Sequence, residues 1–304
     1  MKKICLAISV AAVLFAGCDK TGFSDDETAG GEMIADEGLM HFNMGYPSVK
    51  ATETAFESGD RIGVYITAYE NGEPLALQLG GNYKNNNAVT FDGSVWNAEP
   101  EIYWEEENSK YDVFAYYPFG SPSSVDEMPF DVAENQNIPE TEESLSTYEA
   151  SDFLFASRKG VTSADGSVNL LFKHKMSKLT VVLKKGEDYE GEIPDEGVSV
   201  LIHNTVTSSL IDLSTGDVVK HPRASARTII AKKDALDRYS AIVVPQMILY
   251  KQPLIEIICN GVSYMIETRF QFKSGVQHII NVTLNNNPEQ VKIEIGGEIE
   301  GGWN

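Results

Sequence analysis

The feature that most constrains this chain is an alternation of apolar and polar residues with a period of two, repeated along its length. The segments 62–67 (IGVYIT), 168–173 (VNLLFK) and 291–295 (VKIEI) show it. Successive side chains of a β-strand point to opposite faces, so this period predicts half-buried strands. Helical periodicity is scarce, and a single short helix is expected over Arg227–Ser240. The sequence therefore predicts an all-β protein.

A β-hairpin is predicted around Asn260-Gly261, which stands between two apolar-rich runs. This dipeptide tolerates the positive φ angles of a type I′ turn. A two-residue loop would pair Cys259 with Val262 and Ile257 with Tyr264. Cys259 then lies on the inward face, and we interpret it as a small buried hydrophobe rather than a reactive thiol.

The segment 170–183 predicts a break in strand geometry. Apolar side chains share one face as far as Met176, but the next apolar set begins at Leu179, three residues later. A continuous strand would have to change faces, so we expect a β-bulge or bend near Ser177-Lys178. His174 falls on the inward face, which predicts a hydrogen-bonded core histidine rather than a metal ligand.

Many short strands separated by Gly, Pro and Asn predict antiparallel β-sandwiches, and 304 residues are enough for two. A polar, turn-rich stretch near 156–167 is the expected boundary. The predicted division of the chain is a signal peptide at 1–17, a flexible lipidated tether at 18–38, an N-terminal β-sandwich at 39–160 and a C-terminal β-sandwich at 161–304.

The N-terminus predicts export. Two lysines precede a short apolar run that ends at Gly17 and Cys18. The run is shorter than the about 20 residues that span a bilayer, which is typical of a signal peptide. A cysteine at this border resembles a bacterial lipobox, so we expect cleavage between Gly17 and Cys18 and lipid (palmitate) attachment at Cys18. Phe15 stands where leucine is usual, and ordinary signal cleavage is the alternative.

The net charge of the chain limits which classes of partner it can bind. The chain carries a formal net charge of −21, which opposes binding to nucleic acid. With the lipid signal, this charge fits a protein on a solvated, extracytoplasmic surface.

The usual motifs of catalysis are absent from the sequence. There is no phosphate-binding loop, dinucleotide fingerprint, zinc-protease motif or nucleophile elbow. The five histidines are isolated, and Glu105-Glu106-Glu107 is typical of a solvated turn rather than a glycosidase pair. We therefore expect no enzymatic activity, no cofactor and no metal.

Six segments, in order, resemble the Bacteroidetes fimbrillin family, the subunits of type V pili and their relatives. They are FESGDRIGVY (56–65), YDVFAYYP (111–118), SDFLFA (151–156), VNLLFKHKMSKLTVVL (168–183), VVPQ (243–246) and FKSGVQHIINVTL (272–284). The resemblance implies two transthyretin-like β-sandwich domains in tandem and a structural or adhesion role. It also implies that the partners are other pilus subunits joined by β-strand exchange and that the chain serves as stalk, tip or anchor. The implied location is the outer membrane, as a surface-exposed lipoprotein, or a fimbrium into which the chain is released.

The resemblance further implies maturation by a protease that cuts after a basic residue and releases the first strand. Lys50, followed by Ala51, is the candidate cleavage site. Arginine is usual in the family, but the nearest arginine, Arg61, opens a strand and is expected to be poorly accessible. The removable strand would place on one face the residues Met40, Phe42, Met44 and Tyr46.

The segment near the end of the chain has two interpretations. Val291, Ile293 and Ile295 alternate with charged residues, and they could form a donor strand that fills the groove of another subunit. They could equally form the last strand of their own domain.

An alternative function belongs to another class: a surface lipoprotein that stays monomeric and binds glycans or another host or bacterial surface ligand. It would need exposed aromatic side chains, for which Trp96, Tyr103 and Trp104 are the candidates. A flat, exposed pair of these rings would favour it.

Overall fold

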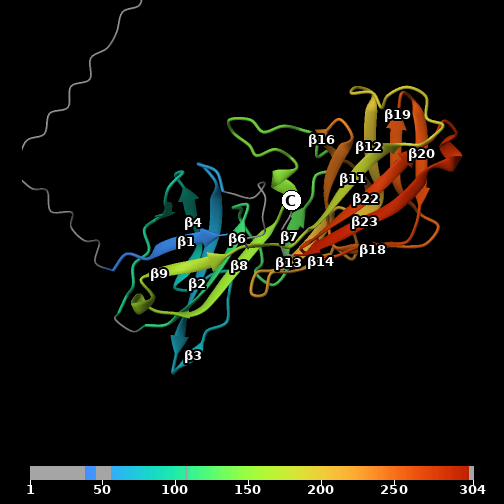
Figure 1. Cartoon of the computed structure of the whole chain (residues 1–304). Helices are drawn as coiled ribbons and strands as arrows, with labels where there is room; N and C mark the ends of the chain where they lie inside the picture. The colour runs from blue at the N-terminus through green and yellow to red at the C-terminus, as the bar shows by residue number, and fades with distance from the viewer. Residues whose placement is uncertain (1–37, 46–55, 107–108, 301–304) are drawn as a thin grey trace, which may run out of the picture. The chain divides into compact units, whose positions relative to one another are not determined.

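The computed structural model describes residues 38–45, 56–106 and 109–300 (Figure 1). Strands dominate them, and helical residues are limited to three short 3₁₀ turns, η1 (Glu149–Ser151), η2 (Ser163–Asp165) and η3 (Pro288–Gln290). The prediction of an all-β fold is confirmed. In the part of the chain described, no helix is long and apolar enough to cross a membrane.

The helix expected over Arg227–Ser240 is wrong. The segment contributes to three strands, β15 (Ala226–Ile230), β16 (Lys232–Ala235) and β17 (Arg238–Val243). Ile229 pairs with Ile202 in one sheet, and Tyr239 pairs with Val181 in another. These long-range pairings bury both side chains and override the weak local preference for a helix.

The largest sheet has nine strands. Its members are β1 (His41–Gly45), β2 (Arg61–Glu70), β3 (Glu73–Pro74), β4 (Lys84–Phe91), β5 (Trp96–Glu99), β6 (Tyr111–Tyr117), β8 (Leu154–Val161), β9 (Ser167–Leu171) and β10 (Lys173–His174). The strand order is β10-β8-β6-β2-β4-β5-β1-β9, and β3 pairs with β2 outside this path. Figure 1 shows β1 and β9 side by side.

The two ends of this strand path are joined by a single residue. β9 ends at Leu171, Phe172 follows, and β10 begins at Lys173. Since β9 pairs with β1 at one end and β10 pairs with β8 at the other, the sheet curls back on itself. It encloses a core of aliphatic and aromatic side chains that includes the fully buried Phe172.

β6 shows why the sequence forms this core. All seven of its residues are buried. Val113 and Ala115 face the interior of the curled sheet, whereas Phe114 and Tyr116 belong to the second core. A strand that is covered on both faces reads as a continuous apolar run, as YDVFAYY does.

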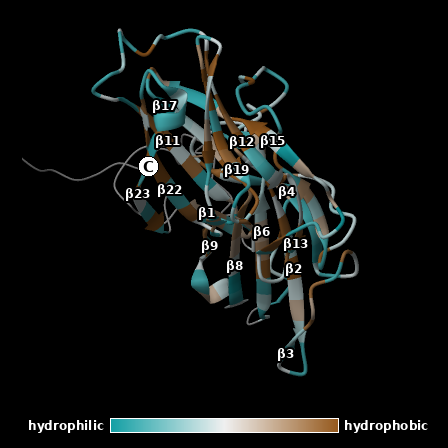
Figure 2. Ribbon diagram, turned by 90° about the vertical axis from the view of Figure 1, so that its right-hand side faces the viewer, coloured by the Kyte–Doolittle hydropathy of each residue, from teal (hydrophilic) through white to brown (hydrophobic). Residues whose placement is uncertain are grey.

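The remaining strands form four smaller sheets. The five-stranded sheet has the order β16-β17-β11 (Ser177–Lys185)-β22 (Val276–Leu284)-β23 (Lys292–Glu300). The others are β15-β12 (Val198–Val206)-β19 (Pro253–Cys259)-β20 (Val262–Glu267), β14 (Asp217–Lys220)-β13 (Ser208–Asp212)-β7 (Met128–Asp131), and β18 (Gln246–Ile248)-β21 (Phe270–Phe272). Inward side chains of the five- and four-stranded sheets share one core. Hydrophobic segments lie mainly along these strands, and the projecting loops are largely hydrophilic (Figure 2).

The predicted hairpin is confirmed. Cys259 pairs with Val262 and Ile257 with Tyr264. Asn260 and Gly261 have φ angles of 50° and 79°, as a type I′ turn requires. Cys259 is 3% exposed, which confirms that it is a buried side chain.

The expected break near Ser177-Lys178 lies immediately before this pair. β10 ends at His174, the chain bends at Met176, and β11 begins at Ser177 in a different sheet. Here the chain leaves the nine-stranded sheet for the five-stranded one. His174 is buried, and its Nδ1 lies 2.8 Å from Oδ2 of Asp152, which confirms a hydrogen-bonded core histidine.

The chain from Gly38 onward forms one compact unit. The division into 39–160 and 161–304 stays a prediction. β9 and β10, which follow the predicted boundary, both pair within the nine-stranded sheet. A division of the chain after β10 would keep both the nine-stranded sheet and the five-stranded sheet whole.

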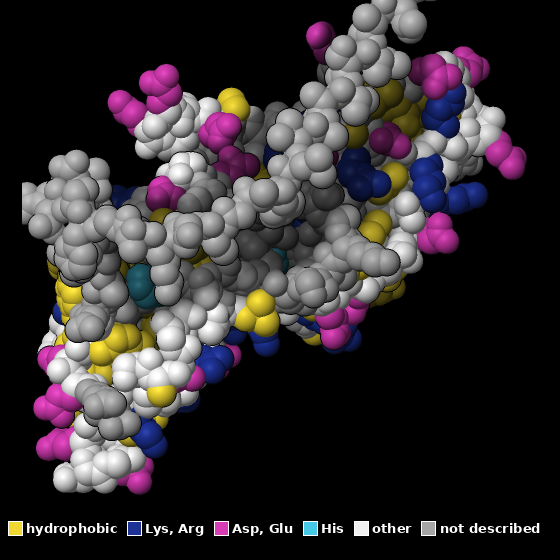
Figure 3. All heavy atoms as spheres, turned by 60° about the vertical axis from the view of Figure 1, so that its left-hand side comes forward, with side chains coloured by type: hydrophobic (Ala, Val, Ile, Leu, Met, Phe, Trp, Pro, Cys, Tyr) yellow, Lys and Arg dark blue, Asp and Glu magenta, His cyan; other side chains and the backbone are white. Residues whose placement is uncertain are grey.

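Acidic and basic side chains are mixed on the face of the described residues in Figure 3. Acidic residues outnumber basic ones, 45 to 24. On the face shown in Figure 3, the two kinds are interspersed, and no broad area of one sign gathers among the described residues. This face offers no extended basic surface for nucleic acid.

Candidate functional site: the first strand and the strand near the C-terminus

β1 is an interior strand with hydrogen-bonded neighbours on both edges. On one edge it pairs in parallel with β9 along its whole length. On the other edge, Phe42 faces Trp96 of β5, and the Met40 N–H donates to the Ile102 carbonyl over 2.7 Å. Among the described strands, β9 pairs with β1 alone. The first strand is therefore the sole hydrogen-bonded partner of another strand.

The inward face of β1 is apolar. Met40 is 2% exposed, Phe42 is 5% exposed and Met44 is half-buried, all against the core of the nine-stranded sheet. Tyr46, the fourth predicted member of this face, lies outside the described residues. A fully buried side chain of this size contributes about 1.5–3 kcal/mol. Burial of Met40 and Phe42 together therefore stabilises the position of the strand by about 3–6 kcal/mol.

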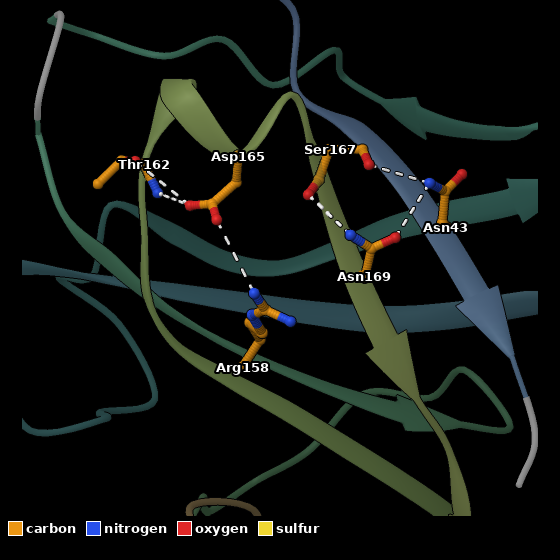
Figure 4. A network of polar contacts seen from close by, with 6 residues as sticks. All are labelled: Asn43, Arg158, Thr162, Asp165, Ser167 and Asn169. Atoms are coloured by element: carbon orange, nitrogen blue, oxygen red, sulfur yellow. Dashed lines mark hydrogen bonds and ion pairs between the residues drawn. The ribbon is translucent and has the colours of Figure 1, made fainter.

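The outward face of β1 carries a polar contact that fixes its register (Figure 4). The side-chain amide of Asn43 donates to Ser167 Oγ over 2.9 Å and to Asn169 Oδ1 over 3.1 Å. Both acceptors belong to β9. A slip of one residue would turn this amide into the core, so the contact and the inward methionines specify the same register.

The turn that leads into β9 is held by its own network, also visible in Figure 4. The Thr162 N–H donates to Asp165 Oδ2 over 2.8 Å, and this capping box begins η2. Arg158 of β8 lies 3.8 Å from the same carboxylate. These contacts hold the start of β9 to β8 without involving β1.

The chain is anchored again at Phe56, directly after residues 46–55, which are not described. Phe56 makes edge-to-face contacts with Trp96, Tyr117 and Phe172, at ring-centre distances of 4.7, 5.7 and 5.4 Å. Asp60 accepts hydrogen bonds from the main chain three residues earlier, over 2.7 Å, and from the Tyr117 hydroxyl, over 3.0 Å. Burial raises the pKa of Asp60, and these bonds oppose the shift. The chain after the gap is thus fixed by Trp96 of β5, Tyr117 of β6 and Phe172.

Besides Tyr46, four predicted site residues lie outside the described part of the chain: Gly17, Cys18, Lys50 and Ala51. Their roles stay predictions. The expectation that Arg61 is poorly accessible is wrong for its side chain, which is exposed and stacks over Phe119 at 4.6 Å. Its main chain is paired with β4 at Thr90, which still protects the peptide bond from a protease.

The proposed donor residues lie at the edge of the five-stranded sheet. Val291 directly follows η3 as its C-cap, and Ile293 and Ile295 lie on β23, which pairs antiparallel with β22. Val291 and Ile293 pack against the core, whereas Ile295 is 65% exposed. In this chain the segment forms the last described strand of its own sheet, and its role as a donor stays a prediction.

The aromatic residues proposed for glycan binding do not form a flat exposed pair. Trp96 stacks against Phe91 at 5.0 Å and is half-buried. Tyr103 is 41% exposed, but its neighbour Trp104 is half-buried and tilts against Tyr111 at 52°. No observation here favours a stacking platform for sugars.

Acidic and metal-ligating groups are likewise dispersed. Glu105 and Glu106 are exposed. Within the described ranges, no cluster of three or more His, Cys, Asp or Glu side chains is placed to hold a metal ion.

The sequence did not predict which two strands, β5 and β9, pair with β1. The parallel partner β9 lies more than 120 positions away, as the Asn43–Ser167 contact shows (124 positions). Segment 168–171 was recognised as a strand, but nothing local assigns its partner. The alternation of β1 itself was the available signal, and it identified the inward face.

The model of the fimbrillin-like family matches residues 50–301. A protein of Bacteroides uniformis, provisionally named fimbrium subunit Fim1C, is 27% identical over 250 residues, which cover 81% of this chain and 76% of that protein.

Two crystal structures share the fold. One is provisionally described as a cell adhesion protein of Bacteroides uniformis. It aligns with a TM-score of 0.64 and 19% identity, and the alignment covers 81% of this chain and 93% of that chain. The other carries the same description and is from Bacteroides ovatus: TM-score 0.65, 18% identity, 88% and 98% coverage. Because the family match spans most of the sequence, this chain belongs to the fimbrillin-like family.

Proposed function

We propose that this chain is a subunit of a surface fimbrium and that it assembles by β-strand exchange after its first strand is cut away. Family membership and the relative named as a fimbrium subunit support the first part. The observation that carries the second is the position of β1. It is an interior strand that fills the core, yet it is separated from the next anchor, Phe56, by a segment that holds a candidate cleavage site at Lys50.

The groove left by β1 would need a replacement. Loss of the strand would expose unpaired main-chain groups along β5 and β9, together with the apolar core beneath Met40 and Phe42. Residues 38–45 span about 26 Å at about 3.3 Å per residue. An edge of this length with an apolar floor is a site for β-augmentation, in which a strand of another subunit restores the hydrogen bonds.

β23 has the pattern that such a groove accepts. Val291, Ile293 and Ile295 repeat at every second position, which is the spacing of the inward side chains of β1. Ile295 is exposed in the free chain, so its burial in a partner would add apolar contact. A second copy of this chain, or another subunit with the same alternation, would supply the donor.

Export and anchoring complete the proposal. Lipid on Cys18 would hold the precursor at the outer membrane, facing outward, and a cut after Lys50 would release it from that lipid. Incorporation of labelled palmitate into the wild-type precursor, with none in Cys18→Ala, supports the anchor. Equal labelling of both proteins contradicts it.

The maturation step is tested by N-terminal sequencing of protein from native cells, alongside an unboiled denaturing gel. A new terminus at Ala51 and a ladder of subunit multiples are expected for the wild type. Lys50→Ala should keep the terminus at Cys18 and abolish the ladder, while Arg61→Ala, a matched loss of one cation, should mature normally. Normal maturation of Lys50→Ala removes this residue from the proposal.

The donor role is tested separately. Ile295→Asp places a charge on a side chain that is exposed in the free chain, so the subunit should fold normally. It should nevertheless fail to form the ladder, because a carboxylate cannot enter an apolar groove without a large desolvation cost. Glu294→Gln, on the adjacent position, should assemble. An intact ladder from Ile295→Asp excludes this segment as the donor.

A further inference from the structure

β23 pairs with β22 in two parts that are separated by a bulge. Residues 292–295 pair with 280–283, and residues 297–300 pair with 276–279. Gly296 is the extra residue between them, and Gly297 has a φ of 143°. A Cβ on Gly296 would lie 2.8 Å from the side-chain nitrogen of Asn281. A side chain at this bulge would therefore force its neighbours apart, and the strand bends at the two glycines.

The two parts are held by different forces. In the first part, Ile293 packs against the core, as does Val291 just before the strand. In the second part, Glu298 accepts from the Lys273 ammonium over 2.5 Å and lies 3.4 Å from Nδ1 of His278. Lys273 precedes β22, and His278 lies within it. A charge contact thus replaces apolar burial beyond the bulge.

His278 orients this contact. Its side chain is 2% exposed and lies edge-on to Phe270 and Phe272, at ring-centre distances of 5.1 and 6.1 Å. Nε2 accepts the Lys273 main-chain N–H over 3.2 Å. This assigns the imidazole proton to Nδ1, which faces Glu298. The buried ring is therefore a fixed donor that positions the carboxylate.

From this geometry we propose that Glu298 is a latch that keeps β23 on its own sheet, and that Gly296-Gly297 is the hinge at which the latched part opens. The proposal rests on the donor role of β23, because a donor strand must first leave its own sheet. Opening of residues 297–300 would expose the edge of β22 and begin that release. Glu298 would therefore set how readily the subunit gives up its strand.

Hydrogen exchange of the full chain, read by mass spectrometry, tests the latch before any assembly. Glu298→Gln keeps the shape and removes the charge, and Lys273→Met removes its partner. Each should raise exchange of residues 276–279 about twofold to fivefold, the range expected for an ion pair of this exposure. Residues 280–284, beyond the hinge, should keep the wild-type rate. The matched control is Glu294→Gln, which lies on the other side of the hinge and should change neither segment.

Two outcomes overturn the proposal. Wild-type exchange at 276–279 in Glu298→Gln means that the carboxylate does not hold the strand. An equal rise in both segments means that β23 opens as one unit and that the glycines are not a hinge.

Assembly of protein cut after Lys50 separates this proposal from the function on which it rests. Faster exchange together with ladder formation about twofold to fivefold faster supports both. Faster exchange in a protein that never forms a ladder leaves the latch intact and refutes strand donation by β23. Faster exchange with an unchanged rate of ladder formation shows that the latch does not control release, which refutes its regulatory role.

Discussion

Phe42→Ala offers the most direct measure of how much the first strand contributes to the fold. The side chain is 5% exposed, and it lies between β5 and β9 in the core of the nine-stranded sheet. Full burial of a phenylalanine side chain is worth about 3 kcal/mol, the upper end of the range for one buried side chain. Alanine recovers about 1 kcal/mol, and the cavity costs a similar amount. The expected loss of stability is therefore about 3–5 kcal/mol.

Urea denaturation of the precursor, followed by tryptophan fluorescence, measures this loss. At an m-value of about 3 kcal/mol/M, the midpoint should fall by about 1–1.7 M. Asn43→Ala, on the outward face of the same strand, is the matched control. It removes side-chain hydrogen bonds at an exposed position and should cost about 1 kcal/mol or less. Equal midpoints for the two variants would refute the conclusion that β1 is fixed mainly by its inward face.

Three further predictions concern residues away from β1. Burial lowers the pKa of His278, and the adjacent lysine lowers that of Glu298. Both folded values lie below the unfolded ones, so stability should decrease as the pH falls below 6.5 and again below 4.5, seen as lower urea midpoints. Gly63→Ala would drive a Cβ into the ring of Tyr116, and the melting temperature should drop by about 4–8 °C. Cys259, which is buried, should be alkylated only after denaturation, as peptide mass spectrometry would show.

Local signals predicted a large part of the fold. The Asn260-Gly261 turn gave the hairpin and its register, because the turn chemistry and the alternation on both sides agree. The inward face of β1 and the core position of His174 followed from a period of two. Each of these features is decided within about ten residues of the chain.

Pairings between distant segments could not be predicted in this way. Nothing in HFNMG indicates that it lies between β5 and β9, because strand partners depend on the whole path of the chain. The helix expected over Arg227–Ser240 was wrong for the same reason. His278 looked isolated in the sequence, and its contact with Glu298 exists only because β22 and β23 are neighbours.

The one-residue connection between β9 and β10 bears on how many strands could replace β1. Phe172 is fully buried and joins the two ends of the strand path, so β9 and β10 stay close through the main chain, while the other strands of the curled sheet are held by hydrogen-bonded pairs. The space between β5 and β9 then corresponds to two strand spacings, about 9.6 Å. A space of this width accommodates one strand, because two strands side by side would need one further strand spacing. Any exchange at this position must therefore be one strand for one strand.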